Sequence, residues 1–128
     1  LRRSWRQLKA NPGAKIALLL IGTNDTKKPI PLDVYEDNLR QIINSIKANG
    51  KTPIVATLPD LEFSPYYMFN RDYINKYNSV INSLSKSMNF MVCNLDGLKD
   101  HLIDGVHFTH EGYKEVAARW AKTILSLR

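Results

Sequence analysis

The chain has 128 residues, of which 44% are hydrophobic, and this size fits one domain with a packed core over residues 1–128. Its net charge of +6 is scattered, and no basic run is interleaved with aromatic residues, which argues against a nucleic-acid partner. One cysteine excludes an intrachain disulfide and a thiolate metal site, and no apolar run reaches the length needed for stable membrane insertion.

The first half of the chain alternates between helical and strand patterns. Residues 2–10 form a short amphipathic pattern that ends at the turn sequence Asn11-Pro12-Gly13. The apolar run from Lys15 to Ile21 lacks polar alternation and predicts a strand buried on both faces. A helix is expected from Asp33, which begins a sequence resembling a capping box, to the stop signal Asn49-Gly50. Pro53 to Leu58 predicts a second buried strand.

The second half continues the alternation. A loop with several aromatic residues leads to a predicted helix over Asp72–Met88 and a third strand over Phe90–Leu95. Thr109 is expected to cap a last helix. The predicted core face of this helix consists of Tyr113, Val116, Ala117, Trp120, Ile124 and Leu127. Such alternation predicts an α/β fold, a three-layer α/β/α sandwich around a parallel sheet with right-handed crossovers.

Two polar loops are expected at the same edge of this sheet. Gly22-Thr23-Asn24-Asp25 directly follows the first strand, at the edge where open α/β sheets place their ligand chemistry. Asp104 and His107 lie three residues apart, just before the last helix. An Asp that orients a His makes a general base at neutral pH. The alternative interpretation is a polar loop that leads into a helix cap.

With these motifs the chain resembles the SGNH/GDSL hydrolase superfamily of esterases and lipases. Gly22-Thr23-Asn24-Asp25 is similar to the family's G-x-N-D block, and Asp104-Gly105-Val106-His107 to its D-x-x-H block. The resemblance implies a flavodoxin-like fold and a Ser-His-Asp triad. His107 would then be the general base, Asp104 would orient its imidazole, and the Asn24 side chain would donate to the oxyanion.

The remaining candidate residues have supporting roles. Gly22, Thr23 and Asp25 are expected to shape the loop around Asn24, which could instead be an Asn that tolerates a left-handed turn. His110 competes with His107, but it falls in the first helical turn and is expected at the surface. An aromatic loop either lines the substrate pocket or packs onto the domain through Phe63, Tyr66 and Tyr67. No metal-ligand or nucleotide-binding motif is present, so no cofactor is expected.

The family's Gly-Asp-Ser block, which provides the nucleophile, has no counterpart in this sequence. Neither has the block whose glycine contributes to the oxyanion hole. The chain therefore resembles the C-terminal portion of the family's domain, without its first two strands. We expect the strand at Ile16–Ile21 to have an unpaired apolar edge, and we expect the missing N-terminal segment of the same protein to be a partner. A naturally short relative is the alternative.

The first functional hypothesis is an ester hydrolase that acts on a small ester or acylated substrate when complete and is inactive as this chain alone. The alternative is an inactive relative that binds carbohydrate or protein at the same sheet edge. A third hypothesis is docking of the N-terminal arginines to an anionic membrane or polymer.

Overall fold

The computed structural model describes residues 6, 9–21, 30–59, 71–98, 101–102 and 108–127. Their elements follow the order β1 (Ile16–Leu19), α2 (Leu32–Ala48), β2 (Thr52–Ala56), α3 (Arg71–Met88), β3 (Met91–Cys93) and α4 (His110–Leu125). Before β1 the chain is helical at Arg6, Lys9 and Ala10. The predicted alternation of helices and strands is confirmed. None of the helices in these ranges is long and apolar enough to cross a membrane.

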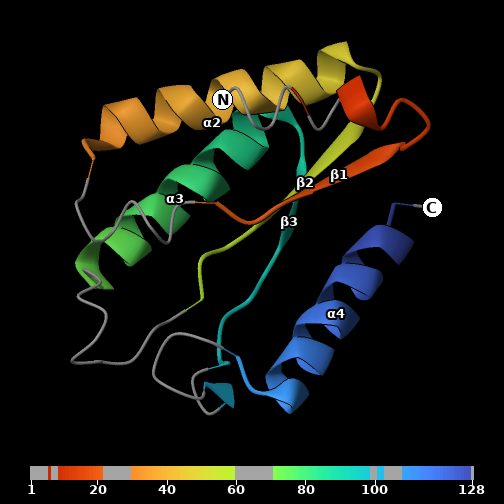
Figure 1. The fold of residues 1–128 in the computed structure, drawn as a ribbon. Coiled ribbons are helices and arrows are strands. Elements are labelled where there is room, and N and C mark those ends of the chain that lie inside the picture. Colours follow the sequence, from red (N-terminus) through yellow and green to blue (C-terminus); the bar gives the residue numbers. More distant parts are fainter. Residues whose placement is uncertain are drawn as a thin grey trace.

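The strands form a parallel sheet in the order β1-β2-β3. Ile16 pairs with Thr52, and Ile54 pairs with Met91. Parallel neighbours require crossover connections, which α2 and α3 provide. These two helices lie together on one side of the strands, and α4 lies on the other side (Figure 1). The described residues therefore form the three layers that the sequence predicts.

The core is divided between the two faces of β2, because successive side chains of a strand point to opposite faces. Val55 faces α2 and α3 in a cluster that includes Tyr35, Leu39, Ile43, Ile74, Tyr77, Ile81 and Leu84. Ile54 and Ala56 face α4 in a second cluster that includes Cys93, Leu95, Leu98 and Phe108. The second strand is thus buried on both faces, as predicted, and the lone cysteine lies in the core.

β1 differs from its prediction. Ala17, Leu19 and Ile21 pack against the buried face of α2. In contrast, 46% of Leu18 and 42% of Leu20 is exposed, so the prediction of a strand buried on both faces is wrong. The reason is that these two leucines lie on the α4 side of the sheet, but α4 packs mainly over β3 and does not cover them. Among the described strands, β1 is also an edge strand, as expected.

The helix ends show one correction. The predicted capping box at Asp33 is wrong, because α2 begins at Leu32 and no side chain caps it. The carbonyl of Pro31 accepts hydrogen bonds from Val34 and Tyr35 instead. Gly50 has φ of 72°, a conformation that favours glycine, and it ends this helix as predicted.

The predicted core face of α4 is only partly correct. Val116, Trp120 and Ile124 pack against the sheet. Tyr113 and Leu127 are 58% and 38% exposed, and Ala117 is exposed as well. The helical periodicity identified side chains that could be buried, but among the described residues the sheet below α4 is too narrow to cover all of them.

Candidate active site

The loops expected to carry the chemistry leave the sheet at one edge, because its strands are parallel. The predicted site residues themselves lie outside the described residues: Gly22, Thr23, Asn24, Asp25, Phe63, Tyr66, Tyr67, Asp104 and His107. The structure describes the residues on which these loops begin and end. These flanking residues show how each loop is attached to the sheet and the helices.

The segment 103–107, which contains Asp104 and His107, is closed at its base. Leu102 forms an antiparallel bridge with Phe108. The backbone N–H of Thr109 donates to the carbonyl of His101 over 2.6 Å. The two ends of this segment therefore lie side by side, and the second of them leads directly into α4.

The start of α4 is fixed against the same base. The Thr109 hydroxyl accepts a hydrogen bond from the Gly112 N–H over 3.0 Å, which confirms the predicted cap. Gly112 is packed so closely that a Cβ atom there would meet the carbonyl oxygen of His101 at 2.7 Å. His110 is exposed, as predicted for the competitor of His107. The segment with the predicted base is thus followed by a helix start that is capped and closely packed.

The segment 22–29, which contains Asn24, is attached at both ends by tyrosines. The Tyr35 hydroxyl donates to the carbonyl of Ile21 over 3.2 Å. The Tyr77 hydroxyl donates to the carbonyl of Ile30 over 3.0 Å and accepts from the Ile30 N–H over 3.1 Å. The two rings stack with their centroids 4.0 Å apart and an angle of 19° between their planes. Both tyrosines are buried, Tyr35 at 2% exposure and Tyr77 at 0%.

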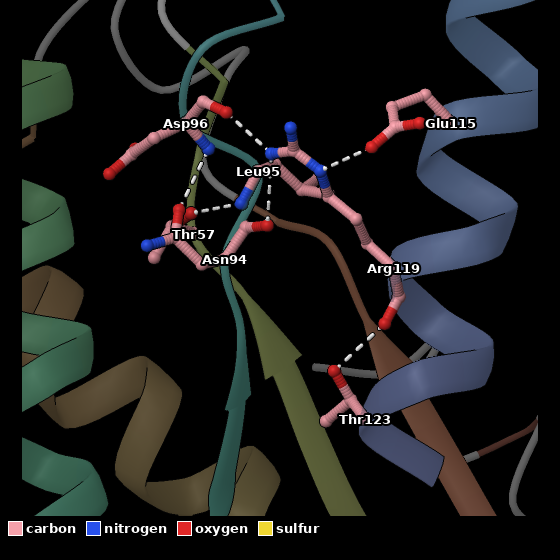
Figure 2. Close-up of polar contacts among 7 residues, drawn as sticks. All are labelled: Thr57, Asn94, Leu95, Asp96, Glu115, Arg119 and Thr123. Carbon is pink, nitrogen blue, oxygen red and sulfur yellow. Dashed lines mark hydrogen bonds and ion pairs between the residues drawn. The ribbon is translucent and has the colours of Figure 1, made fainter. Parts of the chain in front are cut away.

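The end of β2 is attached by two polar side chains. The Asn78 side chain of α3 accepts a hydrogen bond from the Leu58 N–H over 2.7 Å and donates one to the Leu58 carbonyl over 3.0 Å. Its amide therefore bonds both backbone groups of Leu58, as a neighbouring strand would do in a sheet. Thr57 joins the end of β2 to β3, because its N–H donates to the Cys93 carbonyl. Its hydroxyl accepts a hydrogen bond from the Leu95 N–H over 2.8 Å (Figure 2). The start of the aromatic loop is thus fixed.

The end of β3 is attached to α4 by one arginine. Arg119 donates from Nη1 to the carbonyls of Asn94, over 3.3 Å, and Asp96 (Figure 2). Its Nε donates to Glu115 over 3.1 Å. This arginine therefore holds α4 against the turn after β3. Within that turn the Asp96 N–H donates to the side-chain oxygen of Asn94 over 2.8 Å.

The sequence prediction missed these anchoring residues. Tyr35 and Tyr77 fall within two predicted helices but were assigned no role there, and neither Thr57 nor Asn78 was singled out. A sequence signal exists for Thr57, since it is a polar residue inside an apolar strand pattern and is only 4% exposed. Asn78 directly follows a buried aromatic residue on a helix, which by itself indicates no partner. As for metal ligands, the described residues contain no cluster suited to a metal ion.

Comparison with solved structures supports the fold. The chain is similar to a GDSL-like lipase from Bacteroides thetaiotaomicron, with a TM-score of 0.83 and 19% identity over 98% of this chain and 69% of that one. It is also similar to a carbohydrate acetylesterase from Sinorhizobium meliloti, with a TM-score of 0.84 and 15% identity over 99% and 67% of the two chains. A third similar structure is an acetylxylan esterase from Geobacillus stearothermophilus, with a TM-score of 0.69 and 21% identity over 94% and 67%.

No curated protein sequence matches the chain. The family model of the GDSL-like lipases and acylhydrolases, however, matches residues 1–115, which include both motifs that suggested this resemblance. The solved structures show the corresponding α/β fold, and each extends beyond the part that this chain covers. The chain therefore belongs to the GDSL-like lipase/acylhydrolase family and has the flavodoxin-like α/β fold of these structures.

Proposed function

We propose that this chain provides the base and part of the oxyanion hole of a serine ester hydrolase. His107 removes the proton from a serine hydroxyl as that oxygen attacks an ester carbonyl, and then returns it to the leaving alcohol. Asp104 accepts a hydrogen bond from the imidazole and orients it. Asn24 donates its side-chain N–H to the oxyanion of the tetrahedral intermediate. Gly22, Thr23 and Asp25 shape the loop that presents Asn24.

The observation that carries this proposal is the way in which the described ends of both segments are fixed at one sheet edge. Ile21 leaves β1 at this edge under a hydrogen bond from Tyr35. Leu102 and Phe108 close the base of segment 103–107 beside the start of α4. Triad chemistry requires groups held close to their reacting geometry, and rigid attachment of the loops serves that requirement. Membership of an acylhydrolase family supports the same chemistry.

The nucleophilic serine is proposed to come from an N-terminal segment of the same protein that pairs with β1. Among the described strands, β1 pairs with β2 alone, so its other edge is open to a further strand. Leu18 and Leu20 are exposed on the α4 side of this strand. An added strand would pair with the open side of β1, and its helix would cover these apolar side chains. Phe63, Tyr66 and Tyr67 are proposed to line the substrate pocket beside it.

The substrate is proposed to be a small ester or an acylated sugar. Two of the similar structures are described as a carbohydrate acetylesterase and an acetylxylan esterase. Acetylated xylo-oligosaccharides and p-nitrophenyl acetate are therefore the first substrates to assay. No role in the reaction is proposed for a cofactor or a metal ion.

The two neighbouring histidines give a sharp test in the full-length protein. His107→Ala should lower kcat by about 10³-fold or more, as expected for loss of a triad base. His110→Ala is the matched control and should change kcat less than twofold, because His110 is exposed on the first turn of α4. The isolated 128-residue chain should release no p-nitrophenol.

Three results would contradict the proposal. Ester hydrolysis by the isolated chain that persists after His107→Ala would show that the activity has another source. Equal effects of His107→Ala and His110→Ala would remove the assignment of the base. A full-length protein that binds xylo-oligosaccharides but hydrolyses no ester would favour the alternative of a binding module.

A further inference from the structure

Two stacked tyrosines, one on α2 and one on α3, bond the two ends of segment 22–29. Tyr35 on α2 contacts the residue before segment 22–29, and Tyr77 on α3 contacts the residue after it. The two helices lie side by side on the same face of the sheet (Figure 1). One stacked pair therefore reaches both ends of a segment whose flanking residues, Ile21 and Ile30, are nine positions apart.

We propose that the Tyr35–Tyr77 pair positions the oxyanion-hole loop, and thereby the side chain of Asn24. Neither tyrosine is assigned a contact with the substrate, so both are positioning residues. The proposal rests on the proposed function in one respect, namely that Asn24 donates to the oxyanion. The attachment of the loop itself rests only on hydrogen bonds between described residues.

The geometry of the hydroxyl groups carries the argument. A core tyrosine needs only one partner for its hydroxyl, and any nearby carbonyl can serve. Here the Tyr77 hydroxyl bonds both the N–H and the carbonyl of Ile30, which fixes that residue on two sides. The Tyr35 hydroxyl bonds the carbonyl of Ile21, at the opposite end of the same segment.

The stacking makes these attachments stiff. The ring centroids lie 4.0 Å apart, so rotation of either ring requires movement of the other. Tyr73 packs edge-on against Tyr77 with a centroid distance of 5.7 Å and further restricts it. Helices α2 and α3 share a buried core, which gives both tyrosines a common rigid base. A displacement of a catalytic group by about 1 Å can lower the rate by about 10²-fold. Fixing the position of an oxyanion donor should therefore affect kcat directly.

Removal of each hydroxyl tests the proposal in the full-length protein. Tyr77→Phe and Tyr35→Phe keep the rings and their stacking but delete the hydrogen bonds to the segment. Each should lower kcat for p-nitrophenyl acetate by about 10-fold to 100-fold and change KM less than about twofold, because the donor is misplaced while ground-state binding is retained. Ser79→Ala is the control, since it deletes an exposed hydroxyl of α3 that bonds the Asn75 carbonyl of its own helix.

A double-mutant cycle separates positioning from a general loss of structure. If Tyr77 acts through Asn24, Tyr77→Phe should cost less than about twofold once Asn24 is replaced by Ala, because coupled residues give non-additive effects. An undiminished loss in the Asn24→Ala background would overturn the inference. A normal kcat in Tyr77→Phe, together with a low kcat in Asn24→Ala, would overturn it as well and leave the proposed function intact.

Amide hydrogen exchange tests the attachment without any catalytic readout. Tyr77→Phe should accelerate exchange in residues 21–30 by at least about tenfold, while Ser79→Ala should leave it unchanged. If Asn24→Ala retains full kcat, the proposed oxyanion role fails, and with it the catalytic part of the inference. Unchanged exchange in residues 21–30 would also refute the attachment.

Discussion

The carbonyl oxygen of His101 lies 2.7 Å from the point that a Cβ atom on Gly112 would occupy. The Cβ atom of His101 lies 2.8 Å from the same point. Contacts this short leave no room for a side chain at the third residue of α4. The last helix and the connector before segment 103–107 are therefore packed backbone to backbone, and only glycine allows it.

Gly112→Ala should accordingly lower the stability of the protein. Alanine favours helix by about 1 kcal/mol over glycine, but the clash with a backbone carbonyl should outweigh this gain and give a net loss of about 1–2 kcal/mol. Urea denaturation measures the change. Gly13→Ala is the control, because nothing lies within 4 Å of the point that a Cβ atom on Gly13 would occupy, and it should change stability by less than about 0.5 kcal/mol. Equal effects of the two substitutions would contradict the packing argument.

Asn78→Ala should lower the free energy of unfolding more than a typical substitution on a helix surface does. Asn78 satisfies both the N–H and the carbonyl of Leu58, which is only 1% exposed. Without these bonds two buried backbone groups lose their partner, at a cost of about 1–3 kcal/mol. Thermal or urea unfolding checks this value.

Asn82→Ala on the same helix provides the comparison for Asn78→Ala. Asn82 is exposed, so its replacement should change the unfolding free energy by less than about 0.5 kcal/mol. If Asn78→Ala is equally mild, the Leu58 backbone must find other partners, and α3 does not anchor the end of β2.

The sequence was sufficient to predict the order of elements, because apolar runs and helical stripes depend on local composition. Val55 and Ile54 lie inside such a run and are buried on opposite faces of β2, as expected. The prediction failed for Leu18, which belongs to an equally apolar run but is 46% exposed. Periodicity identifies which side chains can be buried, whereas the neighbour that covers them is decided by tertiary structure.

The candidate site was predictable as a pair of motifs, but its supports were not. Asp104, His107 and Asn24 are indicated by resemblance, and their geometry lies outside the described residues. The partner of Tyr77, in contrast, is 47 positions away at Ile30, and no local pattern relates the two. Hydrogen bonds over such separations depend on how the helices pack, so they emerge only from the folded structure.

Arg119→Ala should lower the free energy of unfolding more than Glu115→Ala, although the two residues form an ion pair at 3.1 Å. This pair is partly exposed, so its own contribution is expected to be below about 0.5 kcal/mol. Arg119 also bonds the carbonyls of Asn94 and Asp96, and loss of these bonds should cost about 1 kcal/mol. Unfolding measurements at low and high salt distinguish the contributions, because only the ion pair should weaken with salt. A larger loss for Glu115→Ala would reverse the assignment.

Leu18→Lys should have different consequences in the isolated chain and in the full-length protein. In the isolated chain Leu18 is 46% exposed at the sheet edge, so lysine should raise solubility and lower stability by less than about 1 kcal/mol. In the full-length protein, where the proposed N-terminal segment covers β1, the same change should cost about 2 kcal/mol or more through loss of apolar burial. Leu125→Lys on α4, where the leucine is 59% exposed, is the control and should be mild in both proteins. If Leu18→Lys is also mild in the full-length protein, this face of β1 stays open, and the proposed pairing that supplies the serine is wrong.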